Sequence, residues 1–100
     1  MSVLVTVRVA GDTDRFRSFL ASEGDRLRPI GEEAKGVGCI HHRFSVGDGF
    51  VLAVDEWESG EQFQQFFEGN EAIAEVMRDS GAQGAPEVTI AEAVETQDQF

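Results

Sequence analysis

Two adjoining segments, residues 39–46 and 50–57, place the tightest constraint on how this chain can fold. Both are rich in apolar residues, and the sequence Gly47-Asp48-Gly49 stands between them. An Asp-Gly pair between two such runs is typical of the tight turn of a β-hairpin. We therefore expect two neighbouring antiparallel strands, and the rest of the chain has to pack on them.

Residues 3–10 predict a further strand, because valine at every second position alternates with other residue types. The polar residues at 12–14 offer side-chain caps for a helix that follows this strand. The buried stripe expected for this helix is Phe16, Phe19, Leu20, Leu27 and Ile30. Pro29 and Gly31 predict that the regular helix loosens there, with an irregular continuation toward Lys35.

Residues 58–79 predict two shorter helices. Ser59, followed three residues later by Gln62, is the pattern of a helix N-cap with its reciprocal partner. Gly69 and Asn70 interrupt that helix, and the asparagine side chain can cap the next one. The buried positions expected in the two helices are Phe63, Phe66, Phe67, Ile73, Val76 and Met77.

A last strand is expected after a loop of small residues at 80–86, because Val88, Ile90 and Val94 alternate with other residues. The resulting order is strand, helix, strand, strand, helix, strand. This order is typical of the ferredoxin-like α+β fold, an antiparallel sheet with helices on one face. The length suits a single domain spanning residues 1–100.

The face of such a sheet that the helices leave uncovered is partly apolar in this chain. In the first strand the valines point to one face, and Leu4 and Ala10 point to the other. A chain of 100 residues buries only about 60–70% of its unfolded surface, so a second copy would enlarge a small core. We therefore expect a symmetric homodimer in which two sheets pack face to face.

The charge of the chain argues against several kinds of partner. It has 19 acidic and 8 basic residues, and its formal net charge of −11 repels nucleic acid and anionic lipid. Its single cysteine, Cys39, permits no internal disulfide and no cysteine cluster for zinc. Arg8 interrupts the apolar run at the N-terminus, so we expect no signal peptide or membrane span there and a cytoplasmic location.

The segment 51–67, VLAVDEWESGEQFQQFF, preceded by GCIHHRF, resembles the antibiotic biosynthesis monooxygenases, a family of dimeric α+β barrels. That family commonly shows an acidic residue, one intervening residue, a Trp and then Glu-Ser where the third strand runs into a helix. Here these residues are Asp55, Trp57, Glu58 and Ser59. The resemblance implies a dimer with a pocket between the sheet and the helices of each subunit. Members include oxygenases of quinol- or anthrone-like aromatic molecules that use no metal or flavin, haem-degrading enzymes and cyclases.

The residues that mark the haem-degrading branch of these proteins are missing from this chain. That branch has an Asn on the first strand, which is absent here, and a Trp in the second helix where this chain has Phe66. Its iron-binding His would fall at Glu75 or Val76. A His that many monooxygenase-like members carry near Phe66 is also absent. The resemblance therefore implies no haem, and we expect no cofactor.

The two histidines, His41 and His42, are adjacent in a strand and so point to opposite faces, which prevents them from binding one metal together. The apolar phase holds Ile40, His42, Phe44 and Val46, and the other holds Cys39, His41 and Arg43. We expect His42 on the helix side. Two interpretations of it remain: a buried neutral histidine satisfied by a neighbour such as Asp55, or a general base that removes a phenolic proton so that the anion reacts with oxygen.

The leading hypothesis is cofactor-independent oxygenation of a small aromatic molecule, with His42 as the catalytic base and no metal site. The candidate ligand-binding residues are Phe44, Trp57, Phe63, Phe66 and Phe67, with Phe50 as a further member of the aromatic set. Their helical spacing would equally suit an ordinary core. The alternatives are a non-catalytic ligand-binding or dimerisation module of the same fold, and a cyclase or isomerase that uses the same pocket.

Overall fold

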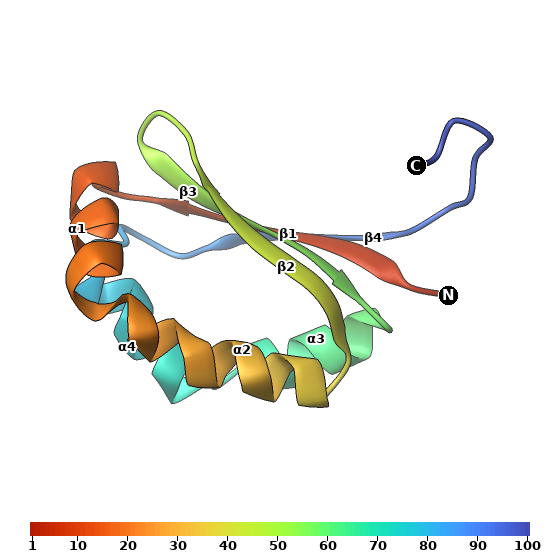
Figure 1. Cartoon of the computed structure of the whole chain (residues 1–100), viewed down its shortest axis with the longest axis horizontal. Coiled ribbons are helices and arrows are strands. Elements are labelled where there is room, and N and C mark those ends of the chain that lie inside the picture. Colours follow the sequence, from red (N-terminus) through yellow and green to blue (C-terminus); the bar gives the residue numbers. More distant parts are fainter.

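The computed structural model describes residues 1–100 as a four-stranded antiparallel sheet with helices on one of its faces (Figure 1). The strands are β1 (Val3–Ala10), β2 (Cys39–Val46), β3 (Phe50–Trp57) and β4 (Glu87–Glu92). The helices are α1 (Thr13–Glu23), α2 (Leu27–Gly36), α3 (Gly60–Phe67) and α4 (Glu71–Asp79), and a 3-10 turn, η1 (Gly24–Arg26), joins α1 to α2.

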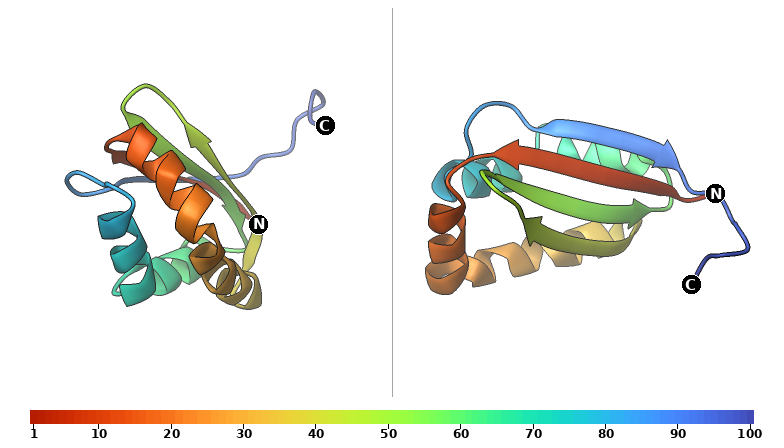
Figure 2. Two further views of the ribbon diagram at one scale, coloured as in Figure 1. Left: turned by 60° about the vertical axis from the view of Figure 1, so that its left-hand side comes forward. Right: turned by 90° about the horizontal axis from the view of Figure 1, so that it is seen from above.

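The strands are ordered β2-β3-β1-β4, and every neighbouring pair is antiparallel. Figure 2 shows the four strands side by side from above, with helices beneath them. This arrangement is the ferredoxin-like α+β fold that the sequence predicts. None of the helices combines the length and the apolar character that a membrane span requires.

Local hydrogen bonds explain where the hairpin turns and where the helices begin. Gly47 donates its backbone N–H to the carbonyl of Phe50 over 2.9 Å, and Gly49 has a φ of 80°, which glycine adopts without steric cost. Asp12, Ser59 and Asn70 each accept backbone N–H groups of the first turn of a helix with their side chains. The hairpin and the two caps at Ser59 and Asn70 confirm the sequence prediction.

A β-bulge near the start of β2 changes which side chains share a face. The register between β2 and β3 shifts between Cys39 and His41, so Ile40 is the extra residue. Cys39 therefore lies opposite Trp57 and on the same face as His42. The prediction that Cys39 shares a phase with His41 is wrong, because strict alternation does not survive a bulge.

The region between residues 24 and 36 also differs from the prediction. The helix is interrupted at η1, and α2 then runs regularly through Pro29 and Gly31 to Gly36. Pro29 lies in the first turn of α2, where a backbone N–H would have no acceptor within the helix. The missing N–H of proline therefore costs no hydrogen bond, and the expected loosening is wrong.

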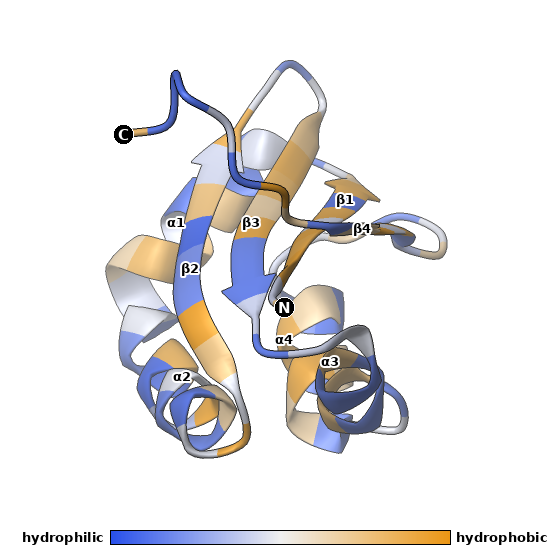
Figure 3. Ribbon diagram, turned by 90° about the vertical axis from the view of Figure 1, so that its right-hand side faces the viewer, coloured by the Kyte–Doolittle hydropathy of each residue, from blue (hydrophilic) through white to orange (hydrophobic).

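The core lies between the sheet and the helices, and Figure 3 shows the apolar colouring of β1 and of much of β3. Its centre is a cluster of Val5, Val7, Ala34, Trp57 and Phe63. Phe16, Phe19 and Val76 are buried as well. Leu20 is 39% exposed instead of buried, and Val94 is 68% exposed because β4 ends before it, at Glu92.

Replacing Val5 by alanine should lower the free energy of unfolding by about 2 kcal/mol, because it removes two methyl groups from a site that is 0% exposed. The same change at Val37, which is 43% exposed, should cost less than about 0.5 kcal/mol. Denaturant titration followed by the fluorescence of Trp57 measures both values. Equal losses at the two sites would contradict the place of Val5 in the core.

Candidate functional site

A cavity of about 600 Å³ lies between the sheet and the helices. Its lining comes from β1, β2 and β3 on one side and from α2, α3 and α4 on the other. Of the 24 lining residues 17 are hydrophobic, so the cavity suits an apolar molecule of small to medium size. The five predicted pocket residues, Phe44, Trp57, Phe63, Phe66 and Phe67, all line it.

The most polar feature of this cavity is a hydrogen-bonded chain of three side chains. Nδ1 of His42 lies 2.6 Å from Oδ1 of Asp55, and Nε1 of Trp57 donates to Oδ2 of Asp55 over 3.0 Å. A carboxylate oxygen can only accept, so His42 carries its proton on Nδ1 in this pair. In the neutral ring the second nitrogen, Nε2, then carries no proton and can accept one.

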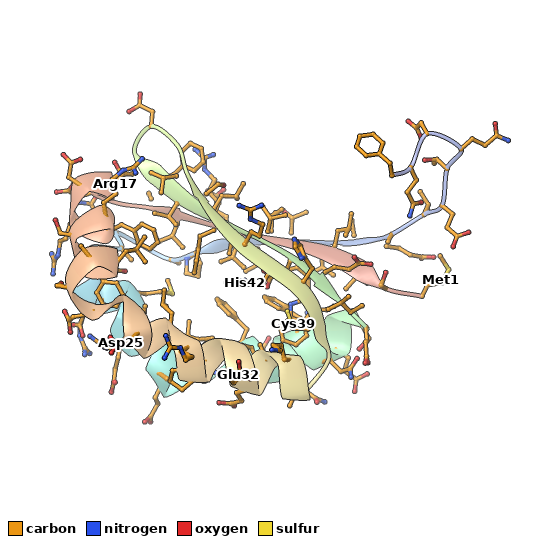
Figure 4. The ribbon with its side chains drawn as sticks, viewed as in Figure 1. Met1, Arg17, Asp25, Glu32, Cys39 and His42 are labelled. Carbon is orange, nitrogen blue, oxygen red and sulfur yellow. The ribbon has the colours of Figure 1, made fainter.

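The sheet register explains why these three side chains meet. His42 lies directly opposite Asp55 in the β2–β3 ladder, and Asp55 and Trp57 are two residues apart on one face of β3. Figure 4 shows His42 and Cys39 at the side of β2 that faces α2. The expectation that His42 lies on the helix side agrees with this geometry, and so does the interpretation in which a neighbour such as Asp55 satisfies it. His41 also borders the cavity.

Burial is unequal along this chain of hydrogen bonds. Trp57 is 1% exposed and the side chain of Asp55 is 8% exposed, whereas the side chain of His42 is 42% exposed. The interpretation of His42 as a buried histidine is therefore wrong in one respect, because its ring is open to solvent. Asp55 is the buried member, and both of its oxygens have a donor. Such a carboxylate fixes the orientation of the imidazole.

Aromatic rings surround the buried end of the site. The ring of Trp57 lies 5.5 Å from Phe63 and 5.4 Å from Phe66, and Phe63 stacks on Phe67 at 5.2 Å. Phe44 packs edge-on against His42, with ring centres 4.8 Å apart. These rings offer flat apolar walls to an aromatic ligand.

Phe50 does not join this aromatic wall. The guanidinium of Arg8 lies over its ring, 3.7 Å from the centre, and Phe50 is absent from the cavity lining. Arg8 belongs to the phase of β1 opposite the buried valines, so this contact is on the far face of the sheet. The sequence prediction that includes Phe50 in the pocket is therefore wrong.

Cys39 lines the cavity as a consequence of the bulge at Ile40. Its Sγ donates to the carbonyl of His41 over 3.4 Å. Burial raises the pKa of the Cys39 thiol, and the nearby Asp55 carboxylate raises it further. Both effects keep the sulfur protonated, so Cys39 is not an activated nucleophile.

The contribution of α2 to the cavity is missing from the sequence predictions. Arg28, Gly31, Glu32 and Lys35 all line it. Their spacing of three, four and seven residues places them on one side of the helix, and this spacing was the signal available in the sequence. In the chain as a whole, no group of three or more His, Cys, Asp or Glu residues is placed to hold a metal ion.

Neither a protein-family model nor a protein with a curated description matches this sequence. Solved structures match over nearly the whole chain. A monooxygenase from the gene ActVA-Orf6 of Streptomyces coelicolor, in complex with nanaomycin D, is 16% identical with a TM-score of 0.64, and 98% of this chain and 93% of that chain are covered. SnoaB, a cofactor-independent oxygenase from Streptomyces nogalater, is 13% identical with a TM-score of 0.60, and the coverages are 98% and 97%.

A dimeric ferredoxin-like protein from an uncultured marine organism is also similar, at 15% identity and a TM-score of 0.68, with coverages of 99% and 93%. At sequence identities this low, the structural matches show a shared fold and no more than that. Structures named as antibiotic biosynthesis monooxygenases, from Deinococcus radiodurans and Bordetella bronchiseptica among others, are also similar, so the chain has the fold of these proteins, and the resemblance expected from the sequence is confirmed at the level of structure.

The reactivity of Cys39 tests the electrostatics of this site. At about pH 8 its thiol should react with Ellman's reagent more slowly than a cysteine in a short peptide, because a raised pKa leaves less of the reactive thiolate. Asp55→Asn removes one cause of the raised pKa and should speed the reaction in the folded protein, as verified by circular dichroism.

Glu56→Gln is the matched control. Glu56 is the next residue of β3, and it accepts a hydrogen bond from Ser2 instead of facing the cavity. Its neutralisation should leave the rate unchanged. A wild-type rate equal to that of the peptide, or equal acceleration by both variants, would contradict this account.

Proposed function

We propose that this protein is a cofactor-independent monooxygenase that oxidises a small quinol- or anthrone-like aromatic molecule in the cavity between its sheet and helices. The observation that carries the proposal is His42 held by the buried Asp55 at the edge of an apolar, aromatic-walled cavity. The fold shared with SnoaB, a cofactor-independent oxygenase, supports the same reaction class.

In this proposal Nε2 of His42 removes an acidic proton from the bound aromatic molecule. The Asp55 carboxylate then stabilises the imidazolium that forms, since it accepts a hydrogen bond from the Nδ1–H group. The carbanion or phenolate of the substrate reduces molecular oxygen and combines with it. An anthrone gains one oxygen atom and loses two hydrogens, so anthrone and O₂ give quinone and water. The substrate itself supplies the electrons.

The surroundings of His42 support this role. The cavity of about 600 Å³ holds a molecule of a few fused rings, and the faces of Trp57, Phe66 and Phe44 suit such a flat ligand. The partly open imidazole can return its proton to solvent after each turnover. An apolar cavity disfavours any anion, but it disfavours the delocalised anion of an extended aromatic system less than a small, strongly hydrated one.

Oxygen uptake with a panel of anthrones and hydroquinones tests the proposal. His42→Gln should lower kcat/KM by about a hundredfold or more, because it removes the general base while keeping a polar side chain. Asp55→Asn should lower it by about tenfold or more, since the imidazole loses its orienting partner. Glu56→Gln, on the neighbouring residue, should keep full activity.

The stoichiometry separates this proposal from its rivals. One O₂ should disappear for each quinone formed, and no product should form under anaerobic conditions. Anaerobic product would indicate a cyclase or isomerase. Oxygen uptake that survives His42→Gln would remove His42 from the mechanism, and ligand binding without turnover would favour a non-catalytic binding module.

We also propose that the protein is a homodimer in which the outer face of the sheet, the face turned away from the helices, packs on its copy. On this face Leu4 is 50% exposed and Val54 is 41% exposed. Apolar surface in contact with water is unfavourable, and packing on a second copy would bury it. Leu4 stands next to the buried Val5 in β1, and Val54 stands next to the buried Asp55 in β3. Neighbouring side chains of a strand point to opposite faces, so Leu4 and Val54 point away from the helices. The dimeric ferredoxin-like structure among the similar proteins supports this assembly.

Light scattering coupled to size exclusion tests the dimer. The wild-type protein should have twice the chain mass of 10.9 kDa. Val54→Glu should give the single-chain mass, because it places a charge at the centre of the outer face. Ala21→Glu adds the same charge to an exposed position of α1 and should remain dimeric. A wild-type monomer, or a dimer that tolerates Val54→Glu, would contradict the proposal.

A further inference from the structure

The cavity has one charged wall, formed by α2. Arg28 and Lys35 lie seven residues apart on this helix, and both line the cavity. Lys35 is 3.6 Å from Glu32, so its charge is partly balanced. Arg28 is exposed at the rim of the cavity and has no ion pair and no side-chain hydrogen bond. One guanidinium therefore stands at the cavity without a partner.

Gly31 lies between these two cations on the same side of α2 and also lines the cavity. A Cβ atom added there would meet no atom within 4 Å. Glycine inside a helix is less stable than alanine, and packing at this position does not require it. The absence of a side chain leaves a notch in the wall of the helix, beside the cavity and between Arg28 and Lys35.

We infer that the substrate is an aromatic molecule that carries a carboxylate, that Arg28 binds this carboxylate, and that Gly31 leaves room for the arm that bears it. The inference rests on the proposed function and adds the substrate class. A guanidinium pairs with the planar carboxylate through two parallel hydrogen bonds. A single unpaired cation, with Lys35 already near Glu32, matches one negative charge better than the two of a phosphate monoester.

The placement also gives the charged arm a function in orienting the ligand. The aromatic part occupies the apolar interior beside Trp57 and Phe66, where a carboxylate would be strongly disfavoured. The carboxylate stays at the α2 wall, close to solvent. Arg28 therefore acts as a specificity residue that fixes which end of the molecule reaches His42, and it takes no part in the proton transfer.

Two ligands that differ only in this charge test the inference: a dihydroxyanthraquinone carboxylic acid and its methyl ester. Both are quinones of the expected product type, and binding is followed by quenching of Trp57, the only tryptophan of a chain without tyrosine. Wild-type protein should bind the acid about tenfold more tightly than the ester. Arg28→Gln should remove that preference by weakening the acid alone.

Gly31→Ala should weaken both ligands while raising the melting temperature, because it fills the notch and improves helix propensity. Gly36→Ala is the matched control: this residue of α2 also has open space around it but does not line the cavity. It should leave both affinities unchanged.

The outcomes separate this inference from the proposed function. Equal binding of acid and ester, or an acid preference that survives Arg28→Gln, would overturn the inference and leave the aromatic pocket standing. Failure of both ligands to quench Trp57 would overturn the aromatic ligand class and the inference with it. Oxygen uptake by an uncharged anthrone, with no gain from a carboxylate, would support the oxygenase and overturn the role of Arg28.

Discussion

The site depends on how one buried carboxylate is satisfied. Asp55 is almost fully buried in β3, and an ionised side chain in such a place is costly unless each oxygen receives a hydrogen bond. Trp57 satisfies one oxygen from within the core, and His42 satisfies the other from the edge strand. The tryptophan is thereby fixed at the centre of the apolar cluster, and the histidine is fixed at the cavity. One residue thus links the packing of the core to the orientation of the proposed base.

The β-bulge in β2 determines which side chains lie near the Asp55 carboxylate. The bulge at Ile40 brings Cys39 onto the helix-side face, opposite Trp57, and leaves His42 in register with Asp55. A bulge lets a strand change which residues it presents without breaking the sheet. The cavity therefore receives a thiol and an imidazole from one short segment. Its far wall comes from α2, whose regular geometry sets Arg28, Gly31 and Lys35 along one side.

Much of this architecture follows from local sequence rules. The hairpin, the caps at Ser59 and Asn70 and the order of elements are predictable because each depends on a few neighbouring residues. The pairing of His42 with Asp55 follows once the hairpin register is known. The phase of Cys39 and the regularity of α2 around Pro29 were not predictable in the same way. The position of a bulge depends on how the whole sheet pairs. A proline is tolerated in the first turn of a helix, so its effect depends on the residue at which the helix starts. The role of α2 in the cavity is a tertiary property.

The most direct test of this account is which nitrogen of the neutral His42 ring carries the proton in the folded protein, observed by two-bond proton–nitrogen correlation NMR of the imidazole. The account predicts a proton on Nδ1, held by Asp55, and an unprotonated Nε2 that is free to act as the base. In Asp55→Asn this preference should disappear while the ring of His41 is unchanged. A proton on Nε2 in the wild-type protein would contradict the central claim, because the nitrogen assigned to accept the substrate proton would already carry one.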